Sequence, residues 1–271
     1  HAGRGEIAPA ARGEGHPRDR RDRGQRFPAK AHAREAPELV AAAKLRRCVA
    51  PAGEYGGRGR HADALQWLRQ AAAAFPADLP ANHPSRSVLH TNIAVAARNL
   101  GHLGEALAHA QRADAIDRVA LGANHPDRAP TMQGLAVVQW RLGERVTAIA
   151  TLQDALAVLD AALGPGHPRS ALLWRTLAML QIDAGDLPAA RGSVQRADVA
   201  MHDAPPAQAG RGRVLNRLCE AELERRAGRF DPAAVAAQAA LDAAQALALP
   251  NDAALAAQLS ALIAIDAGRG E

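Results

Sequence analysis

Large side chains are scarce in this sequence. Aromatic residues make up 3% of its 271 residues, and alanine dominates the hydrophobic fraction. A chain of this composition cannot fill a wide core, but its helices can approach one another closely through small side chains. We therefore expect thin layers in which helix packs on helix.

Cysteine and long apolar runs are also in short supply. The two cysteines, Cys48 and Cys219, show neither the spacing of a metal site nor a disulfide framework. The apolar stretch near the C-terminal end, residues 253–265, is interrupted by Gln258 and Ser260 and is too short to span a bilayer. No charged start followed by an apolar run marks a signal peptide. We expect no membrane contact and a cytoplasmic location.

Catalytic motifs are not evident. The Gly-Arg-Gly of 210–212 lacks the strand and the Lys-Ser/Thr context of a phosphate-binding loop. His102 and His109 lie seven residues apart without a carboxylate that would complete a zinc site. The surroundings of a nucleophile elbow are missing at Ser87, Ser170 and Ser193. The sequence therefore predicts no catalytic residue, no metal site and no cofactor, and a protein that is not an enzyme.

The N-terminal segment differs from the rest of the chain. Residues 1–36 are rich in Arg, Gly, Pro and His and have no hydrophobic periodicity, which is typical of a disordered tail. A basic nucleic-acid-binding arm is the alternative, but acidic residues interrupt its arginines. Residues 37–57 could begin a helix, yet Pro51 and three glycines break it, so we interpret the segment as a truncated or out-of-frame repeat. We place the domain boundary between 57 and 58.

A fixed period of 42 residues organises the chain from residue 58 onward. His83-Pro84 recurs as His125-Pro126 and again as His167-Pro168. A glycine recurs at the same interval, with one extra residue before its last copy, and an alanine follows it five residues later. These structural positions are Gly59, Gly101, Gly143, Gly185 and Gly228, with Ala64, Ala106, Ala148, Ala190 and Ala233. Self-similarity at such a period is the signature of a repeat array.

Each repeat reads as two antiparallel helices. Proline after histidine fits a first helical position, so the first helix of the best-formed repeat should run from about residue 84 to residue 100. The glycine ends that helix, and the second should run from about 103 to 119. Alanines seven residues before and five after the glycine should face each other, so that the two backbones come close.

The turns resemble those of the tetratricopeptide repeat: GRHADA (59–64), GHLGEA (101–106), GERVTA (143–148), GDLPAA (185–190) and GRFDPA (228–233). The 42-residue period and the His-Pro pair resemble the kinesin-light-chain subtype of that family. The resemblance implies an all-α fold, a right-handed superhelical α-solenoid, with about four full repeats and partial terminal repeats over 58–271. The helix from about 251 to 267 would cap the array, or the chain has been cut there.

The resemblance also implies a concave face, lined by the first helix of each repeat, that binds a peptide or a partner helix. Asn92 occupies a position where the family often uses asparagine to bind a peptide backbone. Carried over by position, the binding residues are Thr91, Asn92, Arg98, Asn99, Gln133, Trp140, Arg141, Arg175, Arg225 and Arg226.

Arginines outnumber acidic residues on that face, so we hypothesise an acidic peptide ligand with Trp140 as its apolar anchor. One alternative is a regulatory segment of a larger bacterial signalling protein, such as a serine/threonine kinase with C-terminal repeats. Another is nucleic-acid binding, which the net charge of +5 permits. That alternative predicts aromatic stacking platforms or a broad basic stripe, and neither is evident. The oligomeric state stays open.

Overall fold

The computed structural model describes residues 60–75, 79–202 and 204–268. Every regular element within these ranges is a helix, so the predicted all-α solenoid is confirmed. The predictions made for residues 1–57, and for Gly59, lie outside the described residues.

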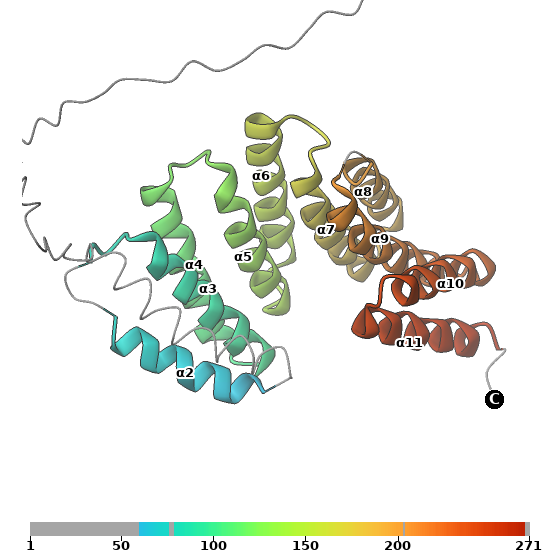
Figure 1. Ribbon diagram of the computed structural model, residues 1–271, viewed down its shortest axis with the longest axis horizontal. Helices are drawn as coiled ribbons and strands as arrows, with labels where there is room; N and C mark the ends of the chain where they lie inside the picture. Colours follow the sequence, from blue (N-terminus) through green and yellow to red (C-terminus); the bar gives the residue numbers. More distant parts are fainter. Residues whose placement is uncertain (1–59, 76–78, 203, 269–271) are drawn as a thin grey trace, which may run out of the picture.

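The helices stack in chain order into a curved array, seen from the blue end to the red end of Figure 1. Each helix packs mainly on its neighbours in the chain, and the contact is largest within each pair of helices. In the described ranges, four helix pairs stand between a single helix at either end. In order, the α-helices are α2 (His61–Ala73), α3 (Pro84–Asn99), α4 (Leu103–Ala120), α5 (Ala129–Arg141), α6 (Arg145–Leu163), α7 (Ala171–Ala184), α8 (Leu187–Ala200), α9 (Pro206–Arg226), α10 (Phe230–Ala246) and α11 (Pro250–Asp266).

The His-Pro pairs cap helices. The Nδ1 atoms of His83, His125 and His167 each accept a hydrogen bond from the backbone N–H two residues on, at 3.2 Å in all three. Each histidine thus satisfies one of the N–H groups that a helix start leaves without a partner. Pro84 begins α3 directly, whereas the other two prolines begin the short 3₁₀ turns η1 (Pro126–Arg128) and η2 (Pro168–Ser170) that lead into α5 and α7.

The turn glycines adopt the left-handed conformation that other residues disfavour. Gly101, Gly143, Gly185 and Gly228 have φ angles of 79°, 88°, 82° and 71°. The backbone therefore reverses between the two helices of each pair without a Cβ penalty. The boundaries predicted for α3 and α4 agree with the structure to within one residue.

Alanine brings the paired helices together. The alanine after each described turn glycine, at 106, 148, 190 and 233, is completely buried. In the pair formed by α7 and α8, Ala178 and Ala190 share one cluster with Ile182 and Val194. Small side chains at the closest approach leave the larger aliphatic residues to fill the space above and below them.

The C-terminal end follows the prediction of a last helix. α11 begins one residue before the predicted start and buries Ala256, Leu259 and Ile263 against α9 and α10. The turn before it differs from the others, because Ala248, and not a glycine, has a positive φ, at 53°.

Among the described helices, α6 alone meets the length and composition of a membrane span. Over an 18-residue window of this 19-residue helix, the mean hydropathy is 1.5 and 28% of the window is buried. Sequence reasoning missed it, because only residues 253–265 were considered as a span. In the solenoid, α6 packs on α5 and buries Leu152, Ala155, Leu156 and Leu159.

Candidate partner-binding face

The first helices of the four pairs, α3, α5, α7 and α9, carry all ten predicted binding residues. We call the surface formed by these helices the helix A face. Two hollows lie in it, one between α3 and α5 and one between α7 and α9.

The α3–α5 hollow is small and apolar at its base, with an arginine at its edge. Thr91 and Arg98, both predicted, lie on its α3 side. Its other lining residues are Ala94, Val95, Ala110, Thr131, Gly134 and Val138.

Two arginines concentrate positive charge beside this hollow. Arg98 is half-buried, and burial, followed by repulsion from Arg141, lowers the pKa of its guanidinium. Within the described residues no carboxylate pairs with either arginine; Arg98 donates only a long hydrogen bond, 3.5 Å, to Asn99 Oδ1. The fold therefore holds two positive charges near each other beside the hollow, without a carboxylate partner in the described ranges.

The α7–α9 hollow combines apolar walls with three arginines. Arg175, a predicted residue, is joined there by Arg169 and Arg211, which sequence reasoning missed. Burial lowers the pKa of Arg175, whose Nη1 donates a hydrogen bond of 3.1 Å to Asn216 Oδ1. The walls are formed by Ala129, Pro130, Leu159, Pro168, Ala171, Leu172, Leu173, Met201, Gly212 and Leu215.

The two additional arginines already have carboxylate partners. Arg169 contacts Asp127 at 2.6 Å, and Arg211 contacts Asp252 at 2.9 Å. Both pairs join neighbouring repeats, since their members lie 42 and 41 residues apart. A separate signal could have found each of them. Arg169 directly follows a His-Pro pair, and Arg211 lies in the Gly-Arg-Gly that was considered only as a phosphate loop.

Two predicted residues connect first helices to each other. Gln133 Nε2 donates a hydrogen bond to Thr176 Oγ1 at 2.9 Å, and Trp140 Nε1 donates one to Asp183 Oδ2 at 2.8 Å. The guanidinium of Arg145 also lies 5.3 Å from the centre of the Trp140 ring. Trp140 is therefore held between α5 and α7 and is only partly open to a ligand.

The remaining predicted residues do not join either hollow. Asn92 is half-buried, and Asn99 is exposed with its Nδ2 atom 3.4 Å from His61 Nδ1. Arg225 and Arg226 both pair with Glu222 at 2.8 Å, and Arg225 also pairs with Asp266 of α11. These partners raise the pKa of Arg225 and neutralise the C-terminal edge of the face.

Within the described ranges, no group of three or more His, Cys, Asp or Glu side chains is arranged to hold a metal ion. Cys219 lies under the helix A face, where burial raises the pKa of its thiol to about 12. Its sulfur therefore stays protonated at neutral pH and is a poor nucleophile. Cys48 lies outside the described residues.

The comparisons with known proteins agree with this geometry. The family model described as tetratricopeptide repeat matches residues 85–161, which include all of α3 but its first residue, all of α4 and α5, and most of α6. A search of curated proteins gives no match.

Three solved structures have a fold similar to that of this chain. Kinesin light chain-like repeats from Podosopora anserina are 22% identical, with 77% of this chain and 96% of that chain covered and a TM-score of 0.57. BtubC (BKLC) from P. vanneervenii is 18% identical, with coverages of 78% and 84% and a TM-score of 0.64. A thermophilic repeat protein, TTC0263, from Thermus thermophilus is 22% identical, with coverages of 79% and 99% and a TM-score of 0.55.

Proposed function

This chain is a tetratricopeptide repeat protein, and we propose that it is a non-catalytic scaffold that binds an acidic segment of a partner protein on its helix A face. The family as a whole supports the general part of the proposal, a protein–protein interaction surface. The acidic character of the ligand rests on this chain's own charges.

The observation that carries the proposal is the charge beside the α3–α5 hollow. Arg98 and Arg141 repel each other and have no carboxylate partner within the described residues. A ligand carboxylate placed between them would remove that repulsion and form charge-assisted hydrogen bonds, which are stronger than neutral ones.

The α7–α9 hollow supports an apolar anchor in the same ligand. Its aliphatic walls include Leu172 and Leu215, and its positive rim is partly compensated by Asp127 and Asp252. An apolar side chain of the ligand would be removed from water in this hollow, which would add affinity. The arginines would favour acidic residues next to that side chain in the ligand. This anchor replaces Trp140, whose indole N–H already has a partner in Asp183.

The same surface would serve if these repeats were the regulatory part of a longer signalling protein. In that arrangement, the ligand would be an acidic segment of the same chain or of a protein that it regulates. Binding to nucleic acid would require stacking platforms, and Trp140, the aromatic residue predicted for the helix A face, is held by Asp183.

Peptide capture tests the proposal. We would immobilise the chain and offer two pools of twelve-residue peptides that differ only in whether three positions carry Asp/Glu or Lys/Arg. We expect the acidic pool to be enriched at low salt and to lose binding as salt increases. The charge reversal Arg141→Glu should abolish this preference, whereas Arg112→Glu, at an exposed position of α4, should leave it intact. Equal capture of both pools by the unmodified chain would rule out the acidic ligand.

A further inference from the structure

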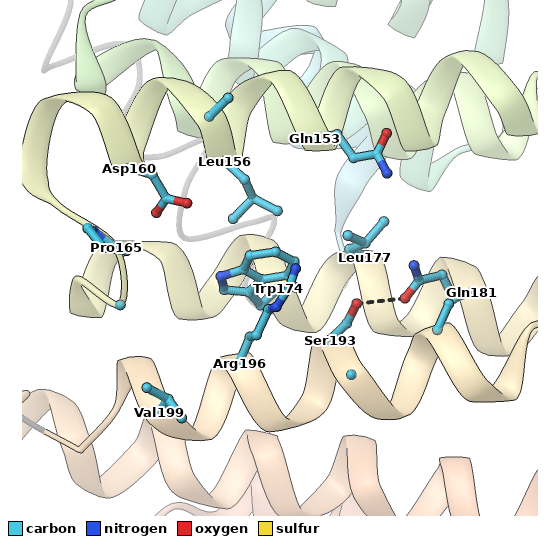
Figure 2. Close-up of a pocket in the computed structure, with 14 residues that line it drawn as sticks. Gln153, Leu156, Asp160, Pro165, Trp174, Leu177, Gln181, Ser193, Arg196 and Val199 are labelled. Atoms are coloured by element: carbon cyan, nitrogen blue, oxygen red, sulfur yellow. Dashed lines mark hydrogen bonds between the residues drawn. The ribbon is translucent and has the colours of Figure 1, made fainter.

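The second helices form a groove that the proposed function does not use. It lies between α6 and α8, with α7 as its floor (Figure 2). Trp174, Leu177 and Gln181 line it at helical spacing, whereas α7 presents Leu172 and Arg175 to the hollow on the helix A face. Residues 172 and 174 are about 200° apart around an α-helix. The groove therefore opens on the opposite side of α7, and we call it the α6–α8 groove.

The groove is open because α6 and α7 make a smaller contact than α4 and α5 do at the same joint one repeat earlier. Trp174 is the only tryptophan at its position in the repeat: one and two periods earlier the chain has Met132 and His90. A side chain of this size fills the joint between neighbouring repeats and leaves an indole face within the groove.

One polar atom in the groove has no partner. Asp160 extends from α6 toward α7 in Figure 2, and its Oδ1 atom is buried without a hydrogen bond. Leaving a buried carboxylate oxygen unpaired is costly. Asp160 also lies in the last turn of α6, where a negative charge opposes the helix dipole. In this conformation the carboxylate therefore does not stabilise the fold, and such an unsatisfied buried group calls for an explanation.

The nearby cation does not pair with it. The guanidinium of Arg196, from α8, lies over the Trp174 ring, 4.7 Å from its centre. It covers one face of the indole, and no ion pair joins it to Asp160 in the described part of the chain. The rest of the groove is mainly apolar, with Leu156, Leu177 and Val199 in its walls, and a Ser193–Gln181 hydrogen bond of 2.7 Å satisfies its polar end.

We propose that the α6–α8 groove binds a basic, amphipathic helical segment of a partner protein, whose lysine or arginine pairs with Asp160 while a leucine-sized side chain packs on Trp174 and Leu156. Asp160 and Leu156 are four residues apart on α6, so the two ligand groups should be separated by about 6 Å, one helical turn. This ligand is opposite in charge to the one proposed for the helix A face and binds on the other side of the molecule.

The test uses helical probe peptides of one design, rich in alanine and glutamine. The first carries leucine and lysine at positions i and i+4, the second replaces lysine with glutamate, and the third replaces leucine with alanine. Binding is followed by the fluorescence of Trp174 after Trp67 and Trp140, the chain's other two tryptophans, are changed to phenylalanine. We expect the leucine–lysine peptide to bind at least about tenfold more tightly than either of the others.

Variants of α6 and α8 make the assignment specific. Asp160→Asn should weaken binding of the leucine–lysine peptide about tenfold, whereas Asp154→Asn, the same change at an exposed site of α6, should change it by less than about twofold. Arg196→Gln should strengthen binding up to about fivefold, because it uncovers the indole and removes a like charge. Asp160→Asn should also leave the melting temperature unchanged or higher, which shows that lost binding is not lost folding.

Two results would overturn the proposal: equal binding of the lysine and glutamate peptides to the unmodified groove, or equal effects of the Asp160 and Asp154 changes. Its failure is distinct from failure of the proposed function, because acidic-peptide capture depends on Arg141 and should survive Asp160→Asn.

Discussion

At the scale of single residues, backbone conformation decides where the repeats turn. Gly185 has no neighbouring atom within 4 Å of the place where a Cβ would lie, so only its φ of 82° opposes a side chain. Ala248 accepts a similar strain before α11, with a φ of 53°. At these turns, a side chain is therefore opposed by the backbone conformation and not by packing against neighbouring atoms.

We predict that Ala248→Gly stabilises the protein by about 0.5–1 kcal/mol. An L-residue in this conformation is strained by about 1–2 kcal/mol, and glycine removes that strain but loses more chain entropy on folding, which offsets part of the gain. The matched change Ala239→Gly, at an exposed position inside α10, should destabilise it by about 0.5–1 kcal/mol. Urea unfolding of both variants would check the pair, and a shift of the same sign in both would contradict the explanation.

A histidine pair gives a second residue-scale prediction. His90 Nδ1 and His109 Nδ1 are 2.8 Å apart, so one ring must donate and the other accept. Burial, followed by the charge of His109, lowers the pKa of His90 to about 4, and burial also lowers the pKa of His109. Arg86 acts in the same direction at His90 and Arg112 at both rings, while Glu105 opposes them at His109.

Because both pKa values are below those of the unfolded chain, about 6.5, the unfolded state takes up protons first as pH falls. The pair's contribution to stability should be complete above pH about 6.5 and be lost between about 6.5 and 4. We expect His90→Gln to reduce the loss of unfolding free energy between pH 7 and 5, roughly the upper part of that window. A pH dependence identical to that of the unmodified chain would show that the pair does not act this way.

At the scale of helices, local rules explain what the sequence could predict. The His-Pro caps and turn glycines act through neighbouring backbone, so a 42-residue repetition of them locates the helix starts and ends without tertiary information. The binding residues depend on partners far along the chain. Arg225 is paired by Asp266, 41 residues later, and Trp140 by Asp183, 43 residues later. Both contacts join neighbouring repeats, but the period does not determine which side chain stands at the partner position.

The α6–α8 groove could not be predicted from the sequence either. Its tryptophan was visible as a departure from the repeat, yet the groove itself exists only because the joint between α6 and α7 is small. Likewise, Arg169 and Arg211 reach one hollow from two different helix starts. Sequence reasoning could place residues on a helix face, but it could not foresee which of them would find carboxylates within the fold.

Helix packing gives an element-scale prediction at α6. Leu152 is completely buried in the cluster that joins α5, α6 and α7. Leu152→Ala should destabilise the protein by about 2–5 kcal/mol through lost burial and a new cavity. Leu142→Ala, at a position that is 38% exposed, should cost less than about 1 kcal/mol. Denaturant unfolding of the two variants would check the difference, and equal losses would contradict this packing.

At the scale of the whole molecule, the two faces of α7 would separate the two kinds of recognition that we propose. The helix A face holds uncompensated arginines at one end and ion-paired arginines at the other. The opposite groove holds an unpaired carboxylate. The net charge of +5 is therefore less informative than its distribution, since we propose ligands of opposite sign for the two surfaces of one solenoid.

The most direct test of the central claim is calorimetric titration of one acidic peptide, selected from the capture experiment, into the unmodified chain, Arg141→Glu and Arg112→Glu at two salt concentrations. If the peptide binds to the helix A face, Arg141→Glu should weaken binding by about tenfold or more and reduce its salt dependence. Arg112→Glu should change the affinity by less than about twofold. Equal effects of the two charge reversals would contradict the claim, because binding would then follow total charge and not the pair formed by Arg98 and Arg141.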